Sequence, residues 1–187
     1  MAWLLGLWRG LRVALVLWLL TVVVITLPLL GLARLVAPDA ALGSLLNREG
    51  RVVGSRWIGQ PFRSARYLNG RPAGGANLPP GDPALRSRVA TASERWGRLG
   101  LDRPAPDLLQ DSGSGVDPHI SLAAARQQLP QLARERSLPL SALETLLRQN
   151  LEGIWGLRAV EPVVNVLRFN LALDALAPVP SASSPPL

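Results

Sequence analysis

The stretch from Asp111 to Ser121 (DSGSGVDPHIS) concentrates side chains that could do chemistry. It combines serine hydroxyls, two carboxylates and the only histidine of the chain, His119. A glycine-rich loop that leads into a helix can bind phosphate through free backbone N–H groups. A phosphate loop of the Walker type, however, has a Lys and a Ser or Thr after its last glycine. Val116 and Asp117 stand at those positions, and the carboxylate would repel phosphate.

The simpler interpretation of the same stretch is the start of a capped helix. Asp117 precedes Pro118, and Ser121 is a good N-cap for the apolar run that follows. The residues alone therefore leave two alternatives open, an anion or nucleotide site and a purely structural helix start.

Nucleophilic catalysis is a third alternative for this stretch. Ser112 or Ser114, His119 and Asp117 could form a Ser–His–Asp triad, but the G-x-S-x-G elbow is absent and close sequence neighbours rarely reach triad geometry. The chain has no cysteine and a single histidine, so a metal site would need carboxylates alone beside His119. We expect no catalytic residue and no metal site.

Three amphipathic helices are predicted around this loop. Asp82 caps the first, whose apolar residues recur at helical spacing from Leu85 to Leu99. The second runs from Ser121 to Arg136. The third starts with a capping box at Ser141 and ends at Gly153.

Two strands accompany the helices. Residues 51–58 and 163–167 read as strands, whereas 168–174 fit a strand and a helix equally well. The predicted fold class is α+β, with a single N-terminal transmembrane helix followed by one small mixed α/β globular domain at residues 39–177. The polar, proline-rich tail at 178–187 is expected to be disordered.

The transmembrane helix is predicted at residues 13–33, which carry no charged side chain, behind an N-terminal tail at residues 1–12. At 1.5 Å per residue it would span about 31 Å, enough for the hydrocarbon core of a bilayer. A cleaved signal peptide is disfavoured, because the best cleavage site, Val36-Ala37, is followed by Pro38. Arginines flank both ends of this segment, so the positive-inside rule hardly distinguishes the two orientations in the membrane. The acid-free tail favours a cytoplasmic N-terminus and a domain outside.

The net charge is +7, and all basic side chains other than His119 are arginines, since the chain contains no lysine. The arginines are scattered singly, mostly near acids, and form no dense basic run. We therefore expect a solvated basic surface and no nucleic-acid partner.

Four motifs in a fixed order behind the apolar segment resemble the KdpC family, the C subunits of bacterial Kdp potassium-transporting P-type ATPases. They are Gly54–Phe62 (GSRWIGQPF), Tyr67 with Arg71–Ala73, Ser112–Ser121 (SGSGVDPHIS), and Val164–Leu167 with Asn170–Asp174. The resemblance extends to about Ala177, and its third motif is the most specific. The departures are modest: Leu68 replaces an aromatic residue, Ala73 and Gly74 stand near an expected serine, and Leu122 replaces a proline.

The resemblance implies a non-catalytic subunit of a complex in the bacterial inner membrane. Its expected partners are a channel-like A subunit, an ATP-hydrolysing B subunit and a small F subunit. The family is described as a catalytic chaperone that raises the ATP affinity of the B subunit, so ATP shared with that subunit is the one implied cofactor. A domain outside the membrane could not touch cytosolic ATP, and the coupling would then run through the complex.

The residues expected to contact a partner subunit or nucleotide form the third motif: Ser112, Gly113, Ser114, Gly115, Asp117 and His119. Gly59, Gln60, Asn77 and Asn165 are lesser candidates. The alternatives from other classes are a stand-alone membrane-anchored ligand-binding module and a Ser/His hydrolase.

Overall fold

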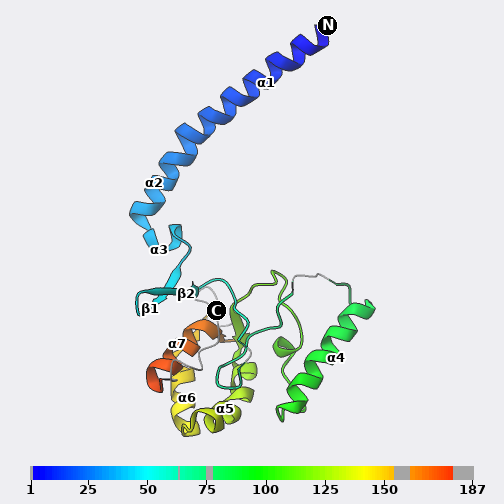
Figure 1. The fold of residues 1–187 in the computed structure, drawn as a ribbon, viewed down its shortest axis with the longest axis vertical. Helices are drawn as coiled ribbons and strands as arrows, with labels where there is room; N and C mark the ends of the chain where they lie inside the picture. The colour runs from blue at the N-terminus through cyan, green and yellow to red at the C-terminus, as the bar shows by residue number, and fades with distance from the viewer. Residues whose placement is uncertain (1, 63, 75–77, 154–160, 179–187) are drawn as a thin grey trace. The chain divides into compact units, whose positions relative to one another are not determined.

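The computed structural model describes residues 2–62, 64–74, 78–153 and 161–178 (Figure 1). The chain divides into two compact units, with the boundary between Leu45 and Leu46. The tail expected to be disordered lies, apart from Pro178, outside the described residues.

The N-terminal unit is dominated by one long apolar helix. Helix α1 (Ala2–Thr21) passes through a π-helical turn, η1 (Val22–Thr26), into α2 (Leu27–Val36), and the short α3 (Pro38–Ala41) follows. The apolar segment Gly6–Val36 has 31 residues and contains an 18-residue window with a mean hydropathy of 2.8. The helix is therefore long and apolar enough to cross a membrane.

Pro28 explains the wider turn within this helix. Proline has no backbone N–H, so a continuous α-helix would lose one hydrogen bond at this point. The π-helical turn η1 ends two positions before Pro28, and such local adjustments are a common way for a membrane helix to accommodate proline.

A hairpin of two strands follows, β1 (Leu45–Arg48), whose first residue still belongs to the N-terminal unit, and β2 (Arg51–Ser55). The two turn residues, Glu49 and Gly50, have φ angles of +51° and +77°. Left-handed conformation at both positions is typical of a tight hairpin turn whose twist matches that of its strands. The strand predicted at 51–58 is thus present but ends at Ser55.

A three-stranded antiparallel sheet lies at the centre of the second unit, in the order β3-β5-β4. The strands are short: β3 spans His119–Ser121, β4 Leu151–Glu152 and β5 Val163–Asn165. In the register, Val164 of β5 faces Ile120 on one side and Leu151 on the other. The sheet thus brings the third motif next to two segments distant in sequence.

The first predicted helix is confirmed as α4 (Pro83–Arg98). The Asp82 side chain accepts a hydrogen bond from the backbone N–H of Ala84 at 2.7 Å, as an N-cap residue should. Gly100 has a φ of +83° just beyond the helix end, the left-handed conformation typical of a glycine there.

The second predicted helix is confirmed as α5 (Leu122–Arg136), preceded by the short 3-10 helix η2 (Pro106–Leu108). Ser121 is its N-cap and accepts a hydrogen bond from the N–H of Ala124 at 3.1 Å. The glycine-rich loop does not run directly into this helix, however, because strand β3 lies between them. The arrangement expected for a phosphate-binding helix start is therefore not formed.

The bounds predicted for the third helix are wrong at both ends. Helix α6 (Leu140–Gln149) begins two residues earlier than a Ser141 N-cap would give, because Pro139 holds the N-cap position instead. Pro139 has extended geometry, and Ser141 already lies in the first turn. The helix ends before Gly153 because Leu151 and Glu152 pair with β5.

The last segment resolves the ambiguity at residues 168–174 in favour of a helix. Strand β5 ends at Asn165, and α7 (Val166–Leu176) follows at once. The Asn165 side chain accepts a hydrogen bond from the N–H of Arg168 at 3.1 Å and so caps the helix. The predicted strand 163–167 is therefore two residues too long.

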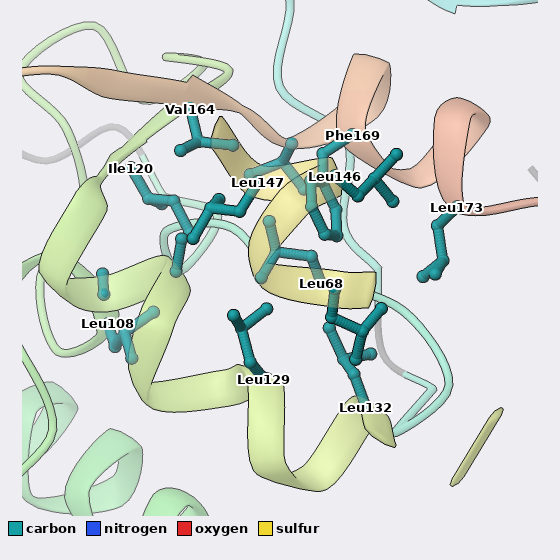
Figure 2. Close-up of a cluster of buried hydrophobic side chains, with 14 of the residues drawn as sticks. Leu68, Leu108, Ile120, Leu129, Leu132, Leu146, Leu147, Val164, Phe169 and Leu173 are labelled. Carbon is teal, nitrogen blue, oxygen red and sulfur yellow. The ribbon is translucent and has the colours of Figure 1, made fainter. Parts of the chain in front are cut away.

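The core lies where α5, α6 and α7 meet the sheet (Figure 1). Figure 2 shows Leu68, Leu147 and Phe169, all fully buried, converging from a loop and two helices. Trp96 is the only buried residue of α4, and its indole N–H donates to the carbonyl of Leu108 at 3.0 Å. The packed helices and sheet thus hold the loops that carry the motifs.

Candidate functional site

The serine- and glycine-rich loop of the third motif is held by its own hydrogen bonds. The Ser112 hydroxyl accepts from the N–H of Asp117 at 3.2 Å, and the Ser114 hydroxyl accepts from the N–H of Val116 at 3.3 Å. Gly115 has a φ of +74°, and its N–H donates to the Ser112 carbonyl at 3.0 Å. The hydroxyls therefore shape a tight turn, as expected of short polar side chains in loops.

His119 lies between two carboxylates. Its Nδ1 is 3.1 Å from Oδ1 of Asp117, and its Nε2 is 3.3 Å from Oε2 of Glu152. The backbone N–H of His119 also donates to Oδ1 of Asp117 at 2.9 Å. Both ring nitrogens therefore face a carboxylate oxygen, a group that only accepts hydrogen bonds.

Arginines surround these carboxylates. Glu152 Oε1 accepts from Arg168 Nη1 and lies 3.5 Å from Arg56 Nη2. Arg71 donates to the backbone carbonyl of His119 at 3.4 Å and lies 3.8 Å from Oδ2 of Asp117. Each acid beside His119 thus also faces at least one guanidinium group.

Asp107 extends this network to the start of helix α5. Its Oδ1 accepts from Arg71 at 3.1 Å, and its Oδ2 accepts from the N–H of Ser121 at 2.5 Å. Arg71, from the second motif, therefore connects Asp107 to the third motif.

A cavity of about 970 Å³ opens beside His119. Trp57 borders it with a half-exposed side chain, and the Trp57 and His119 rings are 6.3 Å apart between centroids. Twelve residues line the cavity: Arg56, Trp57, Arg71, Asp107, Asp117, His119, Ile120, Ser121, Glu152, Gly153, Glu161 and Val163.

The lesser candidates Gly59 and Gln60 lie against the loop of the third motif. The N–H of Gly59 donates to the Val116 carbonyl at 2.7 Å. A Cβ atom at Gly59 would lie 2.7 Å from the Asp117 carbonyl oxygen, so only glycine fits without a backbone shift. Gln60 donates to the Val53 carbonyl at 3.0 Å, which fixes it to strand β2.

Asn165 sits opposite His119 in the strand register. Its side chain caps α7 and also donates to the carbonyl of Arg56 at 2.8 Å. Asn77 lies outside the described residues. The structure therefore brings Gly59, Gln60 and Asn165 close to the third motif, each in a role that holds the backbone.

The Ser–His–Asp triad that the residue types allow is not formed in the structure. The hydroxyls of Ser112 and Ser114 contact backbone N–H groups of their own loop, whereas both ring nitrogens of His119 face carboxylates. Among the described residues, no group of three His, Cys, Asp or Glu side chains could hold a metal ion.

Of the two carboxylates that face His119, sequence reasoning singled out Asp117 but missed Glu152. Glu152 stands alone between a helix and a glycine, and nothing in its spacing marks it. Asp107 and Arg168 were equally unmarked. Arg56 lies in the first motif and Arg71 in the second, but neither was predicted to form an ion pair. A pattern of single charges cannot identify ion pairs that form only after the sheet brings distant segments together.

A second buried network, also missed, surrounds Asp174. Arg136 donates to its Oδ1 at 2.7 Å, Arg48 to its Oδ2 at 2.5 Å, and the Tyr67 hydroxyl to Oδ2 at 3.1 Å. The Arg136 guanidinium also lies 4.7 Å above the Tyr67 ring centre. Burial and the nearby Asp174 carboxylate raise the pKa of Tyr67 above its usual value.

The comparisons with known proteins agree with these motifs. The family model "KdpC: K+-transporting ATPase, c chain" matches residues 7–175. A potassium-transporting ATPase KdpC subunit from Methylibium petroleiphilum is 43% identical, covering 90% of this chain and 98% of the relative. KdpC subunits from a Nostoc species and from Microcystis aeruginosa are 39% and 37% identical, over 91% and 90% of this chain and 96% and 95% of their own. The chain belongs to the KdpC family.

Proposed function

We propose that this chain is the accessory subunit of an ATP-driven potassium uptake complex in the bacterial inner membrane. The family match over residues 7–175 is the observation that carries the proposal. Its relatives are named as subunits of a potassium-transporting ATPase. The partners we propose are a channel-like A subunit, an ATP-hydrolysing B subunit and a small F subunit.

Within the complex, the chain acts as a catalytic chaperone that raises the affinity of the B subunit for ATP. It does not hydrolyse ATP itself. The phosphorylation motif of P-type ATPases, Asp-Lys-Thr-Gly-Thr, requires a lysine, and the chain has none. The aspartyl-phosphate intermediate therefore forms on the B subunit.

The apolar helix Gly6–Val36 serves as a single-pass anchor. We propose a cytoplasmic N-terminus and a domain outside the membrane, since the N-terminal tail carries no acid. In that orientation the domain cannot touch cytosolic ATP. Its effect on ATP affinity is then a population shift, in which the bound chain stabilises the ATP-competent state of the complex.

A pull-down of the tagged chain in mild detergent, from potassium-starved cells, tests the proposal. We expect an ATP-hydrolysing subunit and a channel-like subunit to co-purify, with ATPase activity that potassium stimulates. Recovery of the chain alone would contradict the accessory-subunit function and favour a stand-alone binding module.

A further inference from the structure

The apolar N-terminal helix leaves one backbone carbonyl without its usual donor. At the end of the π-helical turn η1 (Val22–Thr26), the N–H of Leu27 donates to the carbonyl of Val22, five positions back. In a regular α-helix the same N–H would donate to Val23. The next N–H along the chain would be that of residue 28, but Pro28 has none. The Val23 carbonyl therefore receives a hydrogen bond from neither residue.

The hydroxyl groups near this turn do not replace the missing donor. The Thr21 hydroxyl donates to the Leu17 carbonyl at 2.9 Å, one helical turn earlier. Within the described residues the Thr26 hydroxyl forms no hydrogen bond. Among those residues, one helix alone is long and apolar enough to cross a membrane. The described part of the chain thus provides no bonded donor for Val23.

The position of Val23 makes this acceptor costly in a bilayer. Val23 stands at the middle of the uncharged stretch 13–33. The hydrocarbon core contains no water, and an unsatisfied backbone carbonyl there costs several kcal/mol. Backbone groups that a proline frees in a membrane helix are commonly satisfied by neighbouring helices. Single π-helical turns inside α-helices are also frequent at functional sites.

We propose that a membrane helix of a partner subunit packs against the turn η1 and donates a hydrogen bond to the Val23 carbonyl. In hydrocarbon the backbone N–H groups of that helix are already paired, so the donor is a side chain, from serine, threonine, asparagine or glutamine. Such hydrogen bonds help to hold membrane helices together. This inference rests on the proposed function, since it assumes that the chain is assembled with other subunits.

Isotope-edited infrared spectroscopy tests the hydrogen bond directly. Semisynthesis gives the full chain a heavy-carbon, heavy-oxygen label at the Val23 carbonyl alone, which separates its amide band from all others. The band is recorded for the isolated chain in lipid and for the purified complex. Val16, in the regular helix α1, is the matched control, because its carbonyl accepts from the N–H four positions further along.

We expect the Val23 band to move to lower wavenumber when the complex forms, as a new hydrogen bond requires, and the Val16 band to stay in place. An unchanged Val23 band in an intact, potassium-stimulated complex would overturn the hydrogen bond and leave the proposed function standing. A Val23 band that already coincides with the Val16 band in the isolated chain would also overturn it, since Thr26 or water would then be the donor. Failure of any complex to form would overturn both proposals.

Photo-cross-linking identifies the molecule that lies against the turn. Leu27 follows Val23 by four positions and shares its face, whereas Leu29 lies about 200° further round the helix. The two leucines are similarly exposed, at 54% and 59%. Benzoylphenylalanine at Leu27 should cross-link to a membrane helix of a partner subunit at least about fivefold more than at Leu29. Equal yields, or cross-links from Leu27 only to lipid or to a second copy of this chain, would overturn the proposal.

A substitution at Pro28 tests why the carbonyl is available. Pro28→Ala restores an N–H, so the Val23 carbonyl regains a donor within its own helix. Because the partner's donor then competes with this bond, we expect the chain to be lost from the complex about threefold faster. Leu29→Ala, on the other face, should leave retention unchanged. Equal retention of the Pro28→Ala variant and the wild type would overturn the proposal.

Discussion

The Nε2 atom of His119 lies 3.3 Å from Oε2 of Glu152, although 33 positions separate the two residues. Its other ring nitrogen faces Asp117 at 3.1 Å. The only histidine of the chain therefore links the loop of the third motif to strand β4. These contacts explain why the motif can keep a defined shape although much of it is glycine and serine.

Removing the imidazole should loosen this link. We expect His119→Ala to lower the free energy of unfolding by about 1–3 kcal/mol, because both carboxylates lose a partner. Urea unfolding of the detergent-solubilised chain, followed by tryptophan fluorescence, measures the change. The control Glu94→Gln, at an exposed position of α4, should stay within about 0.5 kcal/mol of the wild type. An equally small effect of His119→Ala would mean that its contacts do not stabilise the fold.

Two glycines of the motifs should respond differently to alanine. A Cβ atom at Gly59 would lie 2.7 Å from the Asp117 carbonyl oxygen, whereas one at Gly113 would meet nothing within 4 Å. Gly59→Ala should therefore destabilise the chain by about 1–3 kcal/mol, since the backbone must shift, and Gly113→Ala should be close to neutral. Thermal unfolding of both variants decides this, and equal losses at the two positions would contradict the structure.

The buried network around Asp174 should be more sensitive to substitution than the network around His119. The side chains of Arg136 and Asp174 are 1% and 7% exposed, so Asp174→Ala leaves a buried guanidinium group unpaired. We expect a loss of about 3–5 kcal/mol in the free energy of unfolding. The pair between Arg88, whose side chain is 48% exposed, and Asp111 supplies the control: Arg88→Gln should cost no more than about 1 kcal/mol. A similar cost at both pairs would contradict the burial of Asp174.

The raised pKa of Tyr67 predicts a loss of stability in alkali. The pKa is raised first by burial and then by the Asp174 carboxylate. Well below pH 10 both the folded and the unfolded chain keep the phenolic proton, so the contribution is constant. Above about pH 10 the unfolded chain loses the proton while the folded chain retains it, which lowers the free energy of unfolding.

Tyr67→Phe should lack this alkaline decrease. Because Tyr67 is the only tyrosine of the chain, ultraviolet difference absorbance can follow its ionisation directly. A midpoint in the folded chain at or below that of free tyrosine would contradict the assignment.

The sequence was informative where local rules determine the structure. Asp82 and Ser121 cap their helices as predicted, because the N-cap preference depends only on neighbouring backbone N–H groups. The α+β class and the long N-terminal apolar helix followed from periodicity and composition. The capping box at Ser141 failed because Pro139 provides the residue before the helix start.

Contacts between residues far apart in the sequence could not be predicted from such local rules. Residues 168–174 form a helix because Asn165 ends the strand and caps α7, a choice that their own periodicity does not determine. The sequence marked the third motif as the most specific part of the resemblance. Its partners Glu152 and Arg71 come from segments that only the sheet and the packed loops bring beside His119.

The dependence of ATPase activity on ATP concentration tests the central claim most directly. Partner subunits purified without this chain would be assayed with potassium before and after addition of the purified chain. We predict that bound chain lowers the KM for ATP, with little hydrolysis by the chain alone. An unchanged KM in a complex that demonstrably contains the chain would contradict the proposed function as a catalytic chaperone.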